Sequence, residues 1–309
     1  MKKIILIILI IISSFSLYSC DKEKDDTKLN IVVTMFPEYD WVKNIVLDDQ
    51  SVNLVLLQQS GSDLHNFNPT AKDILTIIDA DLFIYNGGES DNWVNNVFES
   101  SKKEINYLNL LESLGSKAKE EEDIEGLFDE EEDSELDEHI WLSLRNAKYL
   151  VEIIKNELII LNPNMKDKYE LNAKDYISNL DNLDNKYQSL FDKYNDKVIL
   201  LADRFPFRYL VDDYGIKYYA AFKGCQAEVE ASAKTITFLA DKINELNLKT
   251  IFVLETSDSK LANTIIETAN NQGVLIQALN SLQSYTTKDN YNYLEVMDLN
   301  LERILNSFE

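Results

Sequence analysis

The regular alternation of apolar, β-branched runs with longer helical segments is the feature that most constrains the fold of this chain. With helical periodicity between them, strands are predicted at residues 30–35, 52–57, 81–85, 198–202, 218–222, 250–254 and 274–277. Strands that alternate with helices form parallel sheets covered by helices. The length of 309 residues suffices for two lobes. The sequence therefore predicts an α/β fold with two Rossmann-like lobes.

One helical segment is longer than a single small lobe needs. Asn162 is a suitable N-cap, Pro163 suits the first helical position, and no Gly or further Pro follows before about residue 194. About thirty residues at about 1.5 Å each would reach roughly 45 Å. We expect a single rigid helix over residues 162–195 that joins an amino-terminal lobe (30–161) to a carboxyl-terminal lobe (196–309). Its apolar stripe, at steps of three and four, is Tyr169, Ala173, Tyr176, Leu180, Leu183, Tyr187, Leu190 and Tyr194.

Residues 1–19 are typical of an export signal. Two lysines precede an apolar run over residues 4–12, which is too short to span a bilayer. The string LYSC that ends at Cys20 resembles the lipobox of bacterial lipoproteins, in which the cysteine is lipidated. Residues 20–29 are charged and lack apolar periodicity, so they are predicted to form a flexible tether. These features predict an extracytoplasmic protein anchored to the cell membrane by a lipid.

Acidic residues outnumber basic ones by 54 to 30, and the formal net charge is −24. Such a charge repels phosphates, so nucleic acid is excluded as a partner. Thirteen carboxylates and no base lie in residues 120–138. Because like charges repel, residues 119–138 are expected to form a mobile surface loop that splits the first lobe. The loop is either a solvated insertion or a low-affinity collector of divalent cations, and both interpretations remain open.

The chain contains only two histidines, His65 and His139. His65 follows a predicted strand in the string GSDLHNFNPT, and His139 precedes a predicted helix in DEHIWLSLRNAKYL. Imidazole is the commonest side-chain ligand for zinc. From position alone, a structural role for each histidine is as good an interpretation as metal binding. If Cys20 is lipidated, Cys225 has no partner for an intramolecular disulfide.

Three strings carry a specific resemblance: TMFPEYDWVKNIV, GSDLHNFNPTAKDILTIIDADLFIYNGG and DEHIWLSLRNAKYLVEIIKNELIILNPNMKDKYELNA. In order and spacing they resemble the zinc- and manganese-specific solute-binding lipoproteins of bacterial ABC importers. The resemblance runs from about Asn30 to the carboxyl terminus. It implies two α/β lobes joined by one rigid helix, with a divalent metal held between the lobes by four side chains, two from each. His65 matches the family's first histidine ligand and His139 its second.

The second lobe departs from the family pattern. The position that matches the third ligand is Arg204, and the position that matches the fourth is Asn280. A protonated guanidinium cannot coordinate a metal, and an amide oxygen is a weaker donor than a carboxylate. Zinc-specific members carry a loop rich in histidine and acidic residues at the place of the acidic segment, which here contains no histidine.

Cys225 and Glu228 are candidate replacements, because they lie three residues apart in a loop after the predicted strand 218–222. A thiolate and a carboxylate would complete a four-ligand set with two imidazoles that zinc accepts. Alternatively, Cys225 is a small buried residue and Glu228 is stabilised by a helix dipole. Glu255, which follows another predicted strand, is a further reachable carboxylate. The metal ligands predicted from sequence are His65, His139, Cys225, Glu228 and Asn280.

Together these patterns predict a monomeric substrate-binding protein that captures a divalent transition metal, zinc before manganese, for an ABC permease and its ATPase. We do not expect an enzyme, since the chain contains neither an HExxH motif nor a nucleophile elbow. One alternative is a surface adhesin with a degenerate metal site. Another is a carrier of siderophores or other chelates, whose cleft would be lined by Arg204, Phe205, Phe207 and Arg208.

Overall fold

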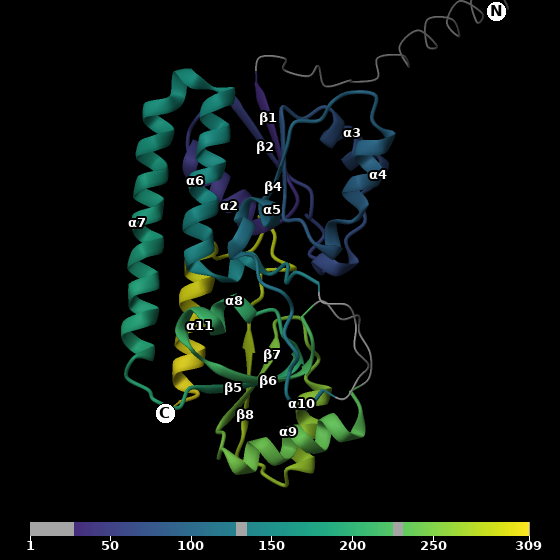
Figure 1. Cartoon of the computed structure of the whole chain (residues 1–309), viewed down its shortest axis with the longest axis vertical. Helices are drawn as coiled ribbons and strands as arrows, with labels where there is room; N and C mark the ends of the chain where they lie inside the picture. Colours follow the sequence, from purple (N-terminus) through teal and green to yellow (C-terminus); the bar gives the residue numbers. More distant parts are fainter. Residues whose placement is uncertain (1–27, 128–134, 225–230, 309) are drawn as a thin grey trace, which may run out of the picture.

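A computed structural model describes residues 28–127, 135–224 and 231–308 (Figure 1). The predicted export signal, the lipidation site Cys20, and the predicted metal ligands Cys225 and Glu228 lie outside the described residues. Among the helices in these three ranges, none combines the length and the apolar character needed to cross a bilayer.

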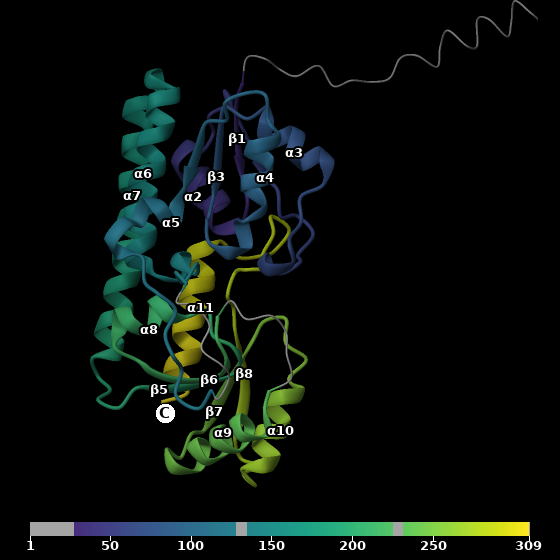
Figure 2. The ribbon, with the colours of Figure 1, turned by 45° about the vertical axis from the view of Figure 1, so that its right-hand side comes forward.

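The first lobe is built on a parallel sheet with strand order β2-β1-β3-β4. Side chains alternate across β1, so Ile31 and Val33 pack on the side of helix α2 (Phe36–Val46), and Val32 packs on the opposite side. Helices α3 (Ala71–Ile78) and α4 (Trp93–Ser100) cover that opposite side (Figure 2). The strands are β1 (Leu29–Val33), β2 (Val52–Leu56), β3 (Leu82–Tyr85) and β4 (Tyr107–Asn109).

The second lobe repeats this topology, with strand order β6-β5-β7-β8 and every neighbour parallel. Its strands are β5 (Val198–Arg204), β6 (Lys217–Phe222), β7 (Thr250–Leu254) and β8 (Leu275–Leu279), and its helices are α8 (Arg208–Tyr214), α9 (Ala233–Glu245), α10 (Lys260–Thr268) and α11 (Tyr293–Asn306). The predicted α/β class and all seven predicted strands are confirmed. The short β4, which is followed by helix α5 (Leu110–Leu114), was not predicted.

In each lobe the strand order reverses once, between β1 and β3 and between β5 and β7. Open parallel sheets bind ligands outside the carboxyl ends of their strands at such a reversal. The loops that follow β2 and β8 meet at this level, where the side chain of Gln58 donates a hydrogen bond to the main-chain oxygen of Gln283 (2.6 Å). The junction of the lobes is therefore where the topology places a binding site.

The predicted long helix is confirmed as α7 (Lys166–Phe191), with 26 residues and a length of about 39 Å. It begins at Lys166 rather than at residue 162, because Pro163–Met165 forms a separate 3-10 turn after helix α6 (Leu144–Leu161), and it ends at Phe191 rather than at residue 195. The α6–α7 pair runs along one side of both lobes (Figure 1).

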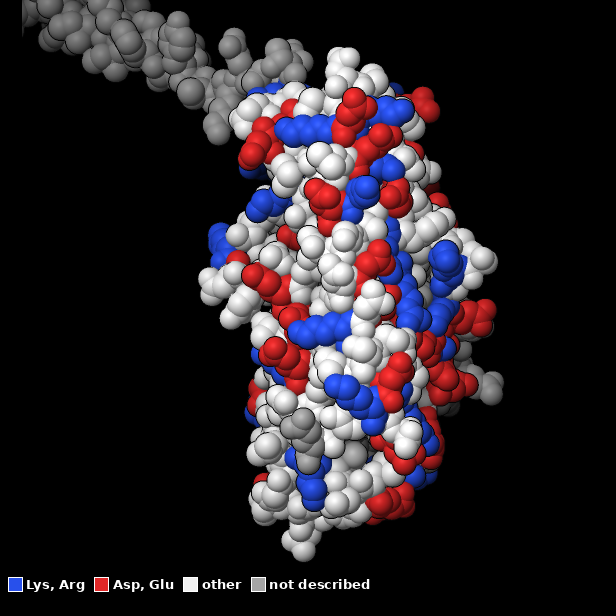
Figure 3. Space-filling model, turned by 90° about the vertical axis from the view of Figure 1, so that its left-hand side faces the viewer, with Lys and Arg blue, Asp and Glu red and all other residues white. Residues whose placement is uncertain are grey.

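On the face of the molecule shown in Figure 3, acidic and basic side chains are interspersed. Ion pairs such as Lys148 with Asp181 (2.6 Å) lie between the two helices.

Tyrosine hydroxyls on the buried stripe of α7 fasten this helix to both lobes. Tyr176 donates to the buried carboxylate of Asp40 in the first lobe (3.0 Å). Tyr187 donates to the main-chain oxygen of Met297 in α11. A helix held to both lobes in this way acts as a strut rather than as a flexible linker.

Buried aromatic residues join the lobes at their centre. The ring of Trp41 lies 5.5 Å from that of Tyr293, which is the first residue of α11. The Tyr293 hydroxyl donates to the main-chain oxygen of Trp141 (2.5 Å), and Trp141 Nε1 donates to the main-chain oxygen of Ser281 (2.8 Å). The lobes are therefore fixed to each other by packing as well as by α7.

The described part of the acidic segment lies against the second lobe, whereas the sequence suggested a loop of the first. Glu122 pairs with Arg208 (3.2 Å) and accepts a hydrogen bond from Tyr218 (3.1 Å). Gly126 packs so closely on the Phe238 ring that a Cβ there would lie 2.1 Å from it. Basic side chains on the second lobe thus offset the charge that was expected to keep the segment in solvent.

Replacing Tyr176 with Phe should lower the free energy of unfolding by about 1–3 kcal/mol, because a buried carboxylate would lose a hydrogen-bond donor. Urea denaturation followed by circular dichroism measures the change. Tyr149→Phe, on the exposed face of α6, is the matched control and should leave stability unchanged. Equal stability of both variants would contradict the anchoring role of Tyr176.

Candidate metal centre

His65 is held by a short turn that follows β2. The 3-10 turn η1 (Leu64–Asn66) is capped by Asp63, whose Oδ1 accepts the main-chain N–H of His65 (3.0 Å). Leu64 is buried and fixes the turn to the core. The imidazole of His65 therefore projects from the carboxyl edge of the first sheet.

His139 lies where the acidic segment meets the 3-10 turn η4 (Ile140–Leu142), and its side chain is fully buried. Asp137 Oδ1 accepts hydrogen bonds from both the main-chain N–H (2.8 Å) and the ring Nδ1 (3.0 Å) of His139. A carboxylate on Nδ1 fixes the imidazole tautomer and leaves the Nε2 lone pair available.

The two imidazoles converge on one point. Their ring centroids lie 5.7 Å apart. Gln283 Nε2 donates to Nε2 of His65 (3.0 Å) and to Nε2 of His139 (2.8 Å). Two imidazoles that share a tetrahedral zinc ion have centroids about 5 Å apart, so a small shift suffices for both to bind one ion. If the amide of Gln283 turned over, its oxygen would face the same point.

Gln283, and not Asn280, is the second-lobe amide that reaches the histidines. Asn280 Oδ1 accepts the main-chain N–H of Leu282 (2.8 Å), so its amide forms the turn that ends β8. The turn carries the chain back, and the side chain three residues later enters the site. Asn280, the predicted fourth ligand, therefore lies in the turn, three residues before the side chain that reaches the histidines.

Arg204, at the end of β5, does not face the site as a ligand. Its guanidinium pairs with Asp63 Oδ2 across the lobes (2.7 Å), and both side chains are largely buried. The carboxylates of Asp203 and Glu255 also accept hydrogen bonds from main-chain N–H groups. The former accepts main-chain N–H groups of Arg204 (2.9 Å) and Leu254 (3.3 Å), and the latter accepts the N–H of Ser281 (2.9 Å).

Cys225 and Glu228 remain predictions, since neither is described. The residue before Cys225 is described and lies beside the site: a Cβ added to Gly224 would be 3.0 Å from His139 Cε1. The chain therefore passes His139 immediately before the two candidate ligands.

Sequence reasoning also missed Glu138. One ligand atom each from His65, Glu138 and His139 lies within 4.8 Å of the others. Glu138 Oε1 is 3.3 Å from His65 Nδ1, on the side of the ring that faces away from Gln283. Its position next to His139 in the sequence was the only signal available.

The two imidazoles differ in protonation. Burial lowers the pKa of His65 to about 3, and the nearby His139 and Arg204 act in the same direction. Burial also opposes the charge of His139, but Asp137 outweighs it and raises the pKa of His139 above its ordinary value of 6.5. His65 is therefore neutral at all physiological pH values, and His139 is the imidazole that takes up a proton.

Of the residues suggested for a chelate carrier, Arg204 lines a hollow of about 760 Å³ in the second lobe, but its guanidinium is paired with Asp63. Phe205 and Phe207 are core residues, and Arg208 pairs with Glu122 and Asp212.

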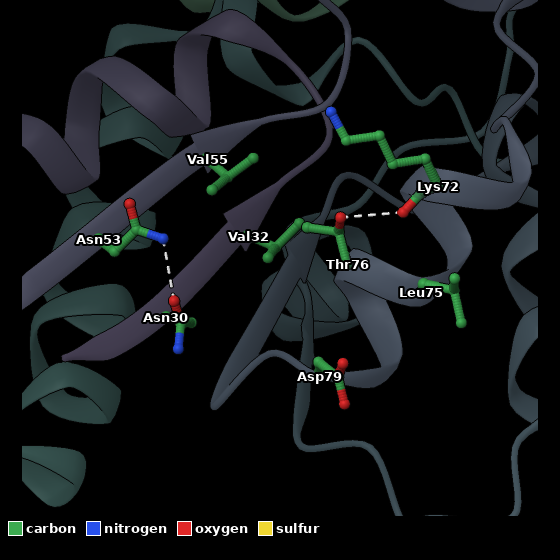
Figure 4. A pocket seen from close by; sticks show the side chains of 8 residues that line it. All are labelled: Asn30, Val32, Asn53, Val55, Lys72, Leu75, Thr76 and Asp79. Atoms are coloured by element: carbon green, nitrogen blue, oxygen red, sulfur yellow. Dashed lines mark hydrogen bonds between the residues drawn. The ribbon is translucent and has the colours of Figure 1, made fainter. Parts of the chain in front are cut away.

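A separate hollow of about 230 Å³ in the first lobe lies between α3 and the strands β1 and β2, away from the imidazoles (Figure 4). It is lined by Asn30, Val32, Asn53, Val55, Lys72, Leu75, Thr76 and Asp79, which do not form a metal-ligand set.

The sequence is similar to those of known zinc-uptake proteins. A family model described as zinc-uptake complex component A, periplasmic (ZnuA) matches residues 31–307. The zinc-binding lipoprotein AdcA of Streptococcus pneumoniae is 32% identical over 98% of this chain, which spans only 60% of that relative's length. The high-affinity zinc uptake system protein ZnuA of Bacillus subtilis is 30% identical over 94% of this chain and 90% of its own length.

Solved structures show the same fold. The Zn(II)-bound ZnuA-like domain of Streptococcus pneumoniae AdcA superimposes with a TM-score of 0.71 at 30% identity, covering 91% of this chain and 98% of that domain. The laminin-binding protein Lmb of Streptococcus agalactiae, described as bifunctional with adhesin and metal transporting activity, has a TM-score of 0.75 at 25% identity, covering 91% of this chain and all of that one.

Affinity for Zn²⁺ should fall as the pH is lowered, and the fall should begin above pH 6.5, because a proton on His139 competes with the metal. Below the raised pKa of His139 the loss should approach about tenfold per pH unit, while His65 stays neutral. Competition with a chelator between about pH 5 and 8 measures the profile. Constant affinity over this range would contradict ligation by His139.

Proposed function

Because this chain belongs to the family of periplasmic zinc-uptake components described as ZnuA, we propose that it captures Zn²⁺ outside the cytoplasm and delivers it to an ABC permease and its ATPase. The observation that carries the proposal is the convergence of both imidazole Nε2 atoms on the Gln283 amide where the lobes meet. The relatives AdcA and ZnuA are described as zinc-binding or zinc-uptake proteins, which supports the same cargo.

His65 and His139 bind the ion from the first lobe in this proposal. From the second lobe, Gln283 contributes its amide oxygen after the side chain turns over, and Cys225 and Glu228 are candidates for the remaining positions. Zn²⁺ suits a set rich in imidazole, whereas Mn²⁺ prefers oxygen ligands, so zinc is the preferred cargo.

Binding from both lobes ties them together through the ion. Since α7 is fastened to both lobes and the aromatic residues Trp41, Trp141 and Tyr293 interlock them, release involves small local shifts rather than wide hinge closure. The permease then recognises a subtle change near the junction.

The carrier is held at the outer face of the cell membrane by a lipid on Cys20. AdcA is described as a lipoprotein, which supports this placement. Adhesion is not proposed as a second activity, because only the description of Lmb points to it, whereas the paired imidazoles point to a metal.

Protein purified without chelators should contain about one zinc per chain, and His65→Ala or His139→Ala should reduce the content to near zero. Elemental analysis measures the content, and circular dichroism checks that each variant is folded. Asn66→Ala, next to His65 but with an exposed side chain, is the control and should retain zinc. Full zinc content in either folded histidine variant would overturn the proposal.

The same measurement on Cys225→Ala and Glu228→Ala tests the two remaining ligand predictions. Loss of zinc in one variant assigns that side chain to the metal. Retention in both means that other donors complete the coordination.

Gln283→Glu should tighten zinc binding by about tenfold or more, because a carboxylate donates to Zn²⁺ better than an amide oxygen. Titration calorimetry with chelator competition measures the change. Gln50→Glu adds the same charge at an exposed turn and should have little effect. Weaker binding in the Gln283 variant would show that this side chain does not face the metal.

A further inference from the structure

Glu138 occupies a site built around its carboxylate. The side chain is fully buried, and its Oε2 accepts the main-chain N–H of Ser90 (3.0 Å). Gly88 lies against it with φ of +90°, and a Cβ there would be 2.5 Å from Glu138 Oε2. The main-chain oxygen of Glu138 accepts the side-chain amide of Asn86 (2.8 Å). The turn after β3 thus holds this carboxylate in one position.

The Ser90 hydroxyl connects this carboxylate to His65. Ser90 Oγ donates to Glu138 Oε1 and lies 2.8 Å from His65 Nδ1. A hydroxyl that donates its only hydrogen to a carboxylate can only accept from the ring, so Nδ1 of His65 carries the proton. The Nε2 lone pair of His65 is then directed at the point where Gln283 now donates.

We propose that Glu138 and Ser90 are positioning residues that hold His65 in the Nδ1-protonated tautomer and so prepare its Nε2 to bind the metal. This inference rests on the proposed zinc function. His139 is held in the same tautomer by Asp137. Two consecutive carboxylates therefore orient both imidazoles, although the two histidines are 74 residues apart.

Glu138 and Asp137 also contribute negative charge close to the two imidazoles. From the second lobe, Gln283, which contacts His65, is neutral, and the charge of Arg204 is matched by Asp63. Glu138 lies behind His65 and Asp137 behind His139, so both can offset the charge of a divalent ion through the imidazoles.

Nitrogen NMR of the metal-free protein labelled with ¹⁵N-histidine tests the tautomer directly at about pH 8, and only two histidines contribute signals. In the wild type we expect His65 to be protonated at Nδ1. Ser90→Ala should convert it largely to the Nε2-protonated form, which free imidazole prefers, and should weaken zinc binding about 10–100-fold. Ser90→Thr keeps the hydroxyl and should preserve both properties.

Glu138→Gln removes the charge at nearly constant volume and should also weaken zinc binding. Ser101→Ala, an equivalent deletion at the end of α4, is the control and should change neither property. An unchanged His65 tautomer in Ser90→Ala overturns the inference, even if zinc binding falls. A tautomer change in a protein that does not bind zinc even as wild type would instead overturn the proposed function.

Discussion

The Nε2 atoms of His65 and His139, both in the first lobe, contact the same side-chain amide of Gln283 in the second lobe. This contact depends on how the two lobes are arranged. Each sheet presents the carboxyl ends of its strands to the other, and the loops after β2 and β8 meet there. The histidines come from separate loops, so neither local structure nor helix periodicity brings them together. Only the fixed relation of the two lobes does so.

The buried charges at the junction are paired in a consistent way. Arg204, which is charged, and His139, which takes up a proton, each have a carboxylate beside them, Asp63 and Asp137, whereas Glu138 lies beside the neutral His65. Burying a charged side chain without an oppositely charged partner would cost roughly several kcal/mol of folding free energy. Asp137 both makes burial of His139 tolerable and orients its imidazole, so stability and the geometry of the candidate site depend on the same contact.

Most of the fold could be predicted from the sequence because it depends on local periodicity. The apolar runs gave seven of the eight strands, and the tyrosine stripe revealed α7. β4 was missed because it has only three residues and its Tyr107 is exposed. At the site, the two histidines could be identified by their type and motif. Gln283 and Glu138 could not, since their roles depend on a turn at Asn280 and on a loop after β3 that is distant in sequence.

Ion pairs hold the described part of the acidic segment against the second lobe. Glu122 and Glu125 pair with Arg208, Lys217 and Lys242 of the second lobe, and the same segment ends at Asp137 and His139. Ion pairs at a surface are screened over about 8 Å at physiological ionic strength. Higher ionic strength therefore weakens the ion pairs that hold Glu122 and Glu125 against the second lobe.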